Sequence, residues 1–365
     1  MGIELETPNS EKTPRDGKNN LFRYGINRVQ GLKKTLEVFN INETINITQE
    51  KELYIFGIFD GHSGNEISQY ISQNFFSEIS KNQNFKSQNY QKALLETFIN
   101  IDKSLREEEI NNILLSISDK NKLKLKERLN DISNVNNNEL NEDDIKGLNT
   151  FMNIINPNNL ENVSVSDYVG SSGLIILIAE NCTYIANAGN SHFIIINKRL
   201  EINNKIEETK KNQNVEEKKR VRIVKGIKYG KNLNDEEYDY TRGFGDYHYK
   251  INNLINIDSP EILSEPFLYE INNKDTKYII AFNNGFYEIF KNYNNLYEDN
   301  KIIYKKISDY FIEQMKDEQK NISDVIANFF DKIFIKDEEI TNDTNLKNKN
   351  NIAHNLSCVI VEFFT

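Results

Sequence analysis

The sequence has few cysteines, two among 365 residues. Cys182 and Cys358 each lie in or beside an apolar run of the kind that forms strands. We therefore interpret both as small core residues rather than as a disulfide or a pair of metal ligands. This sparing use of cysteine is typical of a protein from a reducing compartment.

Long hydrophobic runs are also absent. No segment approaches the roughly 20 apolar residues that a membrane-spanning helix needs, and the N-terminus lacks the apolar core of a secretory signal. Met1 and Gly2 begin the pattern for N-myristoylation, but Glu6 stands where that pattern has Ser or Thr. We therefore expect a cytoplasmic protein with no transmembrane segment, and N-terminal lipidation is the less favoured alternative.

The chain has no excess of positive charge, since 55 acidic residues outnumber 45 basic ones and the formal net charge is -10. Nonspecific binding to nucleic acid needs a dense face of Lys and Arg, so this class of partner is not expected. Short basic runs such as residues 218–220 are typical of solvated loops. The sequence leaves the oligomeric state open.

The segment 53–64 is the most informative one that is present. Its apolar part, rich in aromatic and β-branched residues, stops at Asp60, Gly61 and His62, and a pattern with helical period follows. This order predicts a buried strand that delivers a carboxylate and an imidazole to its own end. An isolated Asp-Gly-His by itself favours a simple turn with a hydrogen-bonded histidine beside it, so the other segments decide between the two.

The remaining patterns predict a flexible segment at residues 1–20 and one domain over residues 21–365. Polar insertions are expected near 112–165, 198–218 and 336–353, because their Asn-rich and charged composition cannot bury enough apolar area. Strands are expected at 22–27, 36–41, 53–59, 278–282 and 356–363, and three short runs at 174–179, 183–188 and 193–197 indicate an antiparallel meander. Helices are expected at 63–82, 88–111, 286–294, 302–317 and 320–335. Together they predict an α+β fold in which antiparallel sheets pack together and helices flank them.

Six motifs give the chain a resemblance to a known family. They stand at residues 56–64, 170–173, 186–192, 241–246, 283–288 and 354–357. In this order they are similar to motifs of the metal-dependent serine/threonine protein phosphatases of type 2C. The resemblance implies a β-sandwich of two antiparallel sheets flanked by pairs of antiparallel helices. It also implies hydrolysis of phosphoserine and phosphothreonine by water activated between two divalent ions.

The resemblance assigns roles to several residues of this chain. Glu37 and Asp60 match metal-binding acids, the carbonyl of Gly61 matches a further ligand, and His62 matches the proposed general acid. Other positions depart from the family: Val38, Asn190, Asn284 and His354 replace acids, and Lys33 replaces the Arg that grips phosphate. Two doubly charged ions about 4 Å apart repel by roughly 17 kcal/mol at an effective dielectric constant near 20, and carboxylates must offset this repulsion.

The loss of four acids and of the arginine favours a pseudophosphatase. Such a catalytically impaired relative would act as a binding or scaffolding subunit for a protein partner or a phosphoprotein. In this interpretation the site holds no metal, or one weakly bound divalent ion at Asp60 with the nitrogen of His354 or the amide oxygen of Asn284 as doubtful ligands. Lys33 then remains as a cationic contact for phosphate, and His62 as a vestigial acid. The alternative is an active phosphatase that uses a magnesium or manganese pair.

Overall fold

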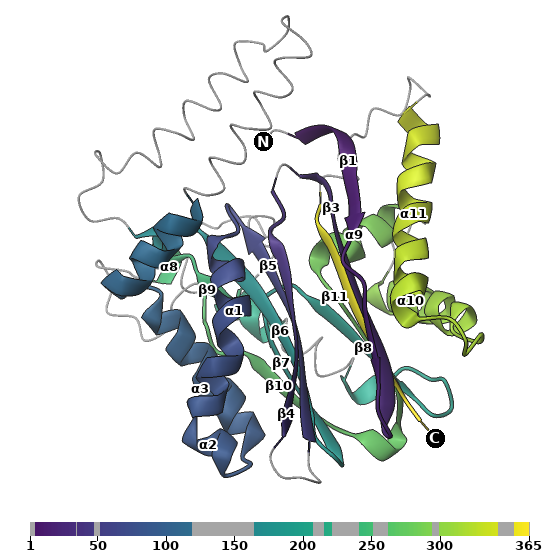
Figure 1. Ribbon diagram of the computed structural model, residues 1–365, viewed down its shortest axis with the longest axis horizontal. Coiled ribbons are helices and arrows are strands. Elements are labelled where there is room, and N and C mark those ends of the chain that lie inside the picture. The colour runs from purple at the N-terminus through teal and green to yellow at the C-terminus, as the bar shows by residue number, and fades with distance from the viewer. Residues whose placement is uncertain are drawn as a thin grey trace, which may run out of the picture.

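The computed structural model of the chain describes residues 4–33, 35–46, 52–118, 164–206, 215–220, 241–250, 262–293, 299–341 and 354–364. Within them, two antiparallel sheets of six strands each face one another, and helices cover their outer faces (Figure 1). The first sheet contains β1 (Glu4–Lys12), β2 (Arg15–Lys18), β3 (Phe22–Lys33), β8 (His192–Asn197), β11 (Thr276–Phe282) and β12 (Leu356–Phe363). Its strand order is β1-β3-β12-β11-β8, with β2 also paired to β3.

The second sheet is the one that delivers the Asp-Gly-His segment. It contains β4 (Val38–Asn46), β5 (Glu52–His62), β6 (Gly170–Ile178), β7 (Cys182–Ala188), β9 (Phe244–Gly245) and β10 (Phe267–Asn272). The order is β10-β7-β6-β5-β4, with the short β9 paired to the beginning of β6. These two sheets and their helices confirm the α+β sandwich that the sequence predicts.

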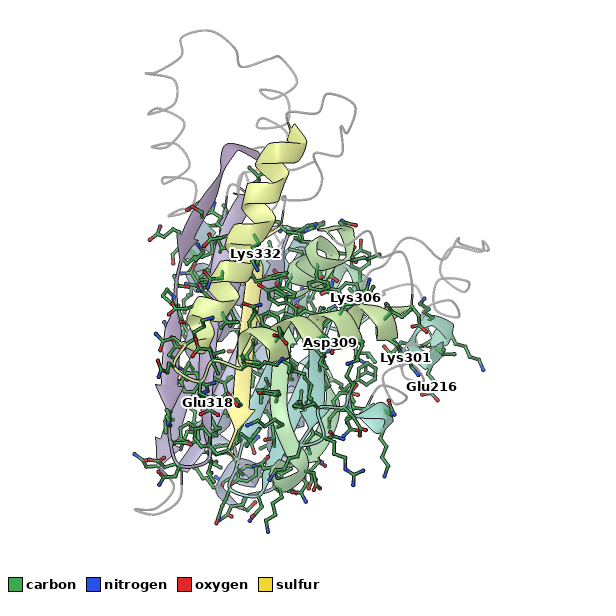
Figure 2. All side chains as sticks on the ribbon, turned by 90° about the vertical axis from the view of Figure 1, so that its right-hand side faces the viewer. Glu216, Lys301, Lys306, Asp309, Glu318 and Lys332 are labelled. Atoms are coloured by element: carbon green, nitrogen blue, oxygen red, sulfur yellow. The ribbon has the colours of Figure 1, made fainter. Side chains whose placement is uncertain are left out.

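Helices close both outer faces. The second sheet carries α1 (Glu66–Lys81), α2 (Gln83–Lys86), α3 (Tyr90–Ser104) and a helix over residues 108–118. The first sheet carries α9 (Asn284–Tyr293), α10 (Asn300–Gln314) and α11 (Ile322–Thr341). The exposed side of α10 is charged, and Figure 2 labels Lys301, Lys306 and Asp309 there. No helix within the described ranges has the length and apolar character needed to span a membrane.

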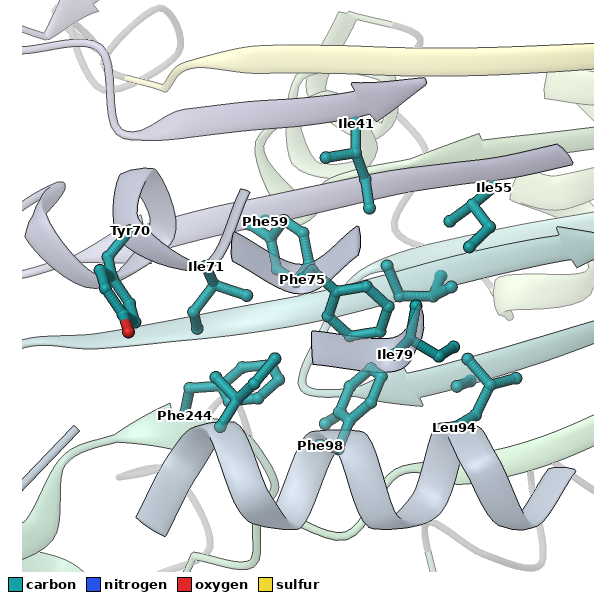
Figure 3. Close-up of a cluster of buried hydrophobic side chains, with 14 of the residues drawn as sticks. Ile41, Ile55, Phe59, Tyr70, Ile71, Phe75, Ile79, Leu94, Phe98 and Phe244 are labelled. Atoms are coloured by element: carbon teal, nitrogen blue, oxygen red, sulfur yellow. The ribbon is translucent and has the colours of Figure 1, made fainter. Parts of the chain in front are cut away.

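Aromatic side chains fill the layer between the second sheet and its helices (Figure 3). Phe59 of β5 contacts Phe75 of α1 with ring centroids 5.8 Å apart, and Phe75 contacts Phe98 of α3 at 5.6 Å. Phe98 in turn stacks on Phe244 of β9 at 5.0 Å. All four side chains are fully buried, and each large buried ring contributes about 1.5–3 kcal/mol of hydrophobic free energy. This chain of rings anchors β5, the strand that carries Asp60.

The structure differs from the sequence-based expectation at two places. Residues 4–12 and 15–18 form strands at the edge of the first sheet rather than a flexible segment. The predicted meander at 174–197 is wrong, because β6 and β7 pair in the second sheet whereas β8 pairs with β11 in the first. The chain changes sheet at Gly189, whose φ of 122° suits glycine and where a Cβ atom would lie 2.4 Å from that of Ser172.

The polar insertions differ in part as well. Helix is present at residues 108–118 and 215–220, and α11 continues to Thr341, so the predicted insertions begin or end inside helices. Residues 119–163, 207–214 and 342–353 of these insertions lie outside the described residues. Helices α9, α10 and α11 lie where the sequence predicts three helices, with bounds shifted by one to six residues.

Candidate functional site

Strand register places three side chains in a row at the end of the second sheet. Asp60 on β5 lies directly opposite Val38 on β4 and Ser172 on β6. Directly opposite residues of antiparallel strands point to the same face, with Cβ atoms about 4.5–5.5 Å apart. Val38 is fully buried in the core between the sheets. The row therefore contains one carboxylate, and the position beside it is apolar.

Asp60 accepts a hydrogen bond from an amide. Nδ2 of Asn283 lies 3.0 Å from Oδ2 of Asp60. Burial raises the pKa of the Asp60 carboxyl to about 6, and Glu37 adds to this shift, while Lys33, the Asn283 amide and His62 oppose it. Close to neutral pH the carboxyl is therefore ionised against a substantial cost of desolvation.

Asn283 occupies the first position after β11, and its whole amide group is used. Nδ2 donates to Asp60 and to the carbonyl oxygen of Asn355 at 2.8 Å, while Oδ1 accepts from the backbone N–H groups of Ser357 at 2.9 Å and Phe286 at 3.3 Å. The residue is 1% exposed. Asn283 thus joins β11, β12 and the first turn of α9 at the carboxylate of Asp60.

Asn284, which the sequence places at a lost metal acid, has a different partner. Its Oδ1 lies 3.3 Å from Nε2 of His192, and Nδ1 of His192 lies 2.7 Å from the hydroxyl of Tyr304. The His192 ring also stacks on Tyr287, with centroids 4.3 Å apart. Through these contacts, the amide oxygen of Asn284 helps to hold β8, α9 and α10 together.

Lys33 and Glu37 form an ion pair at the turn between β3 and β4. Nζ of Lys33 lies 2.5 Å from Oε2 of Glu37, and the hydroxyl of Thr35 donates to Oε1 at 3.1 Å. Burial lowers the pKa of Lys33, but the ion pair and hydrogen bond with Glu37, together with Asp60, more than offset this, so the pKa is raised overall. The ammonium group is therefore held by the Glu37 carboxylate and attracted by the charge of Asp60.

Gly61 lies where the chain approaches another backbone closely. Its N–H donates to the carbonyl oxygen of Glu37 at 3.0 Å, and Ser68 donates to the same oxygen at 2.7 Å. A Cβ atom at position 61 would lie 2.6 Å from the Gly64 carbonyl oxygen and 2.7 Å from Oγ of Ser68. Only glycine fits this contact between β5, α1 and the turn that carries Glu37.

His62 pairs with a carboxylate that comes from a distant segment. Its Nε2 lies 2.6 Å from Oδ2 of Asp246, whose side chain is almost fully buried while that of His62 is 30% exposed. Asp246 has a φ of 52°, in the left-handed region that costs a non-glycine residue energy. A carboxylate on one imidazole nitrogen fixes the ring orientation and tautomer, as general acid or base chemistry requires.

A buried ion pair holds the segment that carries Asp246. Nζ of Lys250 lies 2.8 and 2.7 Å from the two carboxylate oxygens of Asp102, and it also donates to the carbonyl oxygen of Gly243 at 2.8 Å. Asp102 accepts the N–H of Gly245 at 2.8 Å. Residues 243–250 are thereby fixed to α3, and with them the carboxylate that orients His62.

The donors around Asp60 do not fit a pair of hard divalent ions. Within the described part of the chain, no group of three or more His, Cys, Asp or Glu side chains is arranged to hold a metal. Asp60 and Glu37 already accept hydrogen bonds from Asn283 and Lys33. His354 lies beside Gly285, where a Cβ atom would come within 2.8 Å of the Cβ of His354. Magnesium and manganese need several anionic oxygens, and two committed carboxylates do not supply them.

The sequence predicts site roles for Lys33, Glu37, Asp60, Gly61 and His62, and all five lie at one end of the sandwich. The predictions do not include Asn283 as the partner of Asp60 or a role for Asp246. A signal existed for each: Asn283 is an N-cap type of residue directly after a buried strand, and Asp246 follows a glycine within one of the six motifs.

Comparison with known proteins gives a consistent result. The model of the family described as protein phosphatase 2C matches residues 22–122 and 116–295. Probable protein phosphatase 2C 4 of Paramecium tetraurelia is 25% identical over 289 residues, which cover 79% of this chain and 80% of the relative. Protein phosphatase 2C 1 of the same organism is 27% identical over 266 residues, 73% of each chain.

Solved structures show the same fold at low identity. The crystal structure of serine-threonine phosphatase 2C from Toxoplasma gondii superposes with a TM-score of 0.52 at 11% identity, covering 97% of this chain and 99% of the other. A second phosphatase structure from a pathogenic strain of Toxoplasma gondii gives a TM-score of 0.53 at 13% identity, with 97% and 96% covered.

Proposed function

The chain belongs to the protein phosphatase 2C family, and from this premise we propose that it is a catalytically impaired member that acts by binding a protein partner or phosphoprotein. The family implies phosphoproteins as the ligands of this site, the end of the sandwich that carries Lys33, Glu37, Asp60, Gly61 and His62, which we call the cleft. In this proposal the scaffold of the cleft is retained, whereas the metal-assisted hydrolysis that the family performs is lost or strongly reduced. The protein then acts by occupancy rather than by turnover.

The contact between Asn283 and Asp60 carries this proposal. The amide donates to Oδ2 of Asp60 at 3.0 Å and is fixed by three further hydrogen bonds. A carboxylate that binds a metal ion presents its lone pairs to the metal, and a donor N–H on the same oxygen competes for them. The neighbouring position, Val38, supplies no charge. The arrangement thus supports a cleft that is stable without a pair of divalent metal ions.

Recognition of a phosphoprotein remains chemically reasonable in this cleft. A lysine ammonium has three donors, and the ion pair with Glu37 uses one of them. The side chain of Lys33 is 30% exposed, so a phosphoryl oxygen can approach its outer side. A point charge gives weaker geometric selection than the arginine fork that the family has at this position. We therefore expect modest affinity for the phosphate group and a larger contribution from the surrounding protein surface.

An active manganese- or magnesium-dependent serine/threonine phosphatase is the second candidate. It is favoured by the His62–Asp246 pair, which keeps an oriented imidazole beside Asp60 and Gly61. An imidazole oriented in this way can transfer a proton to the leaving oxygen. If this candidate is correct, a metal pair must form from Asp60, Glu37 and neutral ligands.

Calorimetric titration with manganese and magnesium, together with a phosphopeptide turnover assay, distinguishes the two candidates. We expect weak or no metal binding and no turnover above that of the Asp60→Ala variant. Two-site binding with manganese-dependent phosphate release that Asp60→Ala abolishes would overturn the proposal. A pull-down with the same phosphopeptide and its unphosphorylated form measures recognition separately from turnover.

A further inference from the structure

We propose that the ammonium group of Lys33 is a tethered counterion, bound to Glu37, that takes the place of a bound cation beside Glu37 and Asp60. The chain would thus carry its own positive charge in the cleft and offset the charge of its two acids without metal. This inference rests on the proposed function in one respect, that the wild-type cleft holds no divalent pair. It gives Lys33 the role of counterion. This role does not follow from its proposed contact with phosphate or from the loss of metal-binding acids.

The position of Lys33 follows from the turn between β3 and β4. Lys33 ends β3, and Glu37 precedes β4 by one residue, so four residues bring the two side chains within 2.5 Å. The Glu37 side chain is 13% exposed. A pair this close and this poorly hydrated interacts much more strongly than an exposed ion pair on the surface.

Glu37 is held in place by its backbone rather than by a metal ion. Its N–H donates to Oδ1 of Asn355 at 2.7 Å, and its carbonyl oxygen accepts from Gly61 and Ser68. Asn355 also donates to the carbonyl oxygens of Gln30 at 2.7 Å and Thr35 at 3.2 Å. The turn is therefore preorganised for the ion pair, and no external ligand is needed to fix Glu37.

Asp60 completes the charge arrangement. Asp60 directly precedes Gly61, whose N–H donates to the carbonyl oxygen of Glu37 at 3.0 Å, so Asp60 lies close to this turn. The opposite charges of Lys33 and Asp60 attract, which lowers the pKa of Asp60 and contributes to the raised pKa of Lys33. Glu37 acts on Asp60 in the opposite direction. With Lys33 present the three groups carry a net charge of about -1, and without it two carboxylates share the cleft uncompensated.

Removal of Lys33 should therefore expose a latent cation site. A unit charge about 4 Å from a divalent ion repels it by about 2 kcal/mol even at the dielectric constant of water, which corresponds to about a 30-fold change in affinity. We expect Lys33→Met to bind manganese at least about 30-fold more tightly than the wild type.

The test measures binding of manganese alone to the full chain, by calorimetry and by the thermal midpoint in chelator and in excess manganese. Lys277→Met is the matched control, because Lys277 is also a partly buried lysine, paired with Glu362 at 2.9 Å. The double variant Lys33→Met with Glu37→Gln locates the new site, since it removes a carboxylate on which the gain should depend. Circular dichroism verifies that each variant is folded.

The inference predicts that Lys33→Met loses stability in chelator and regains it with manganese, whereas the wild type and Lys277→Met do not respond to manganese. The gain should disappear in the double variant. If a folded Lys33→Met binds no more manganese than Lys277→Met, the counterion role is refuted while the proposed function stands. If Lys33→Met does not fold in chelator, manganese should restore the fold. If manganese does not restore it, the counterion role is also refuted. Two-site manganese binding by the wild type with phosphopeptide turnover would refute the proposed function itself.

Discussion

At the residue scale, the pair formed by Val38 and Asp60 determines what the cleft can hold. A carboxylate at position 38 would lie beside that of Asp60, in a position that is fully buried. We expect Val38→Asp in chelator to lose about 3–5 kcal/mol of unfolding free energy, because a buried charge without a partner is among the most destabilising changes. Urea unfolding with and without manganese measures the loss and any recovery by metal.

Val38→Thr is the control for this change, since it keeps the shape of the side chain and adds no charge. Its loss should be clearly smaller than that of Val38→Asp and should not respond to manganese. Equal losses in the two variants would mean that packing rather than charge limits this position.

The titration of Asp60 gives a second prediction at this scale. Its pKa of about 6 lies above the ordinary value of 3.8, so the folded state binds more protons than the unfolded state between these values. Ionisation of Asp60 therefore destabilises the fold as pH rises, by about 3 kcal/mol at neutral pH. Asp60→Asn should be equal in stability to the wild type near pH 4 and more stable above pH 6. Unfolding of both proteins in chelator across this range measures the difference, and a constant difference would contradict the prediction.

At the scale of elements, Asn283 connects the end of β11 to the start of α9. Asn283→Ala leaves backbone N–H groups of Phe286 and Ser357 without their acceptor, and we expect a loss of about 2–3 kcal/mol. Asp299 before α10 offers an exposed comparison, because its carboxylate accepts one bond, from Lys301 at 3.3 Å. Asp299→Ala should lose about 0.5–1 kcal/mol. Denaturant unfolding of both variants measures the contrast, and similar losses would argue against the buried role of Asn283.

The buried pair of Asp102 and Lys250 is a second connection between elements. Burial lowers the pKa of Lys250, and Asp102 opposes that shift. Lys250→Met leaves the Asp102 carboxylate buried without its cation, so we expect a loss of about 3–5 kcal/mol. Lys305→Met, which removes an exposed pair with Asp309, should change stability by less than about 0.5 kcal/mol. Denaturant unfolding is the measurement for both, and a small effect of Lys250→Met would show that the pair is not needed to hold residues 243–250.

The elements also show how far the sequence could be interpreted. The sequence predicts β5, which carries Asp60, because its apolar run is long and its end carries polar residues. The sheet to which β8 belongs was not predicted, since β6, β7 and β8 have similar apolar patterns and a pattern does not specify a pairing partner. The edge strands at residues 4–18 were missed because edge strands exposed to water can be polar.

The candidate site was predictable to a similar extent. Asp60 and His62 stand at the end of a recognisable strand, so the local pattern points to them, and the other motifs decide in favour of a site over a simple turn. The partners Asn283 and Asp246 arrive from 223 and 184 positions away. Such contacts depend on which strands pair, and single-sequence patterns do not contain that information.

At the scale of the whole molecule, the sandwich should be indifferent to metal removal. Its three hydrophobic clusters and the ion pair of Lys33 with Glu37 are complete without a cation. We expect the thermal midpoint of the wild type to be the same, within error, in chelator and in millimolar magnesium. A metal that binds the folded state with a dissociation constant 100-fold below its concentration would add about 2.7 kcal/mol. A clear rise in the midpoint with magnesium would therefore contradict the prediction.

The place of β12 has a consequence for how this protein is made. β12 lies between β3 and β11, and Asn355 just before it fixes the turn that carries Glu37. During synthesis on the ribosome, the edges of β3 and β11 that pair with β12 therefore stay unpaired until residues 356–363 emerge. The cleft cannot assemble earlier. Unpaired strand edges favour mispairing between nascent chains. We therefore expect folding to be completed by the late insertion of β12 and to benefit from chaperones that cover the edges of β3 and β11.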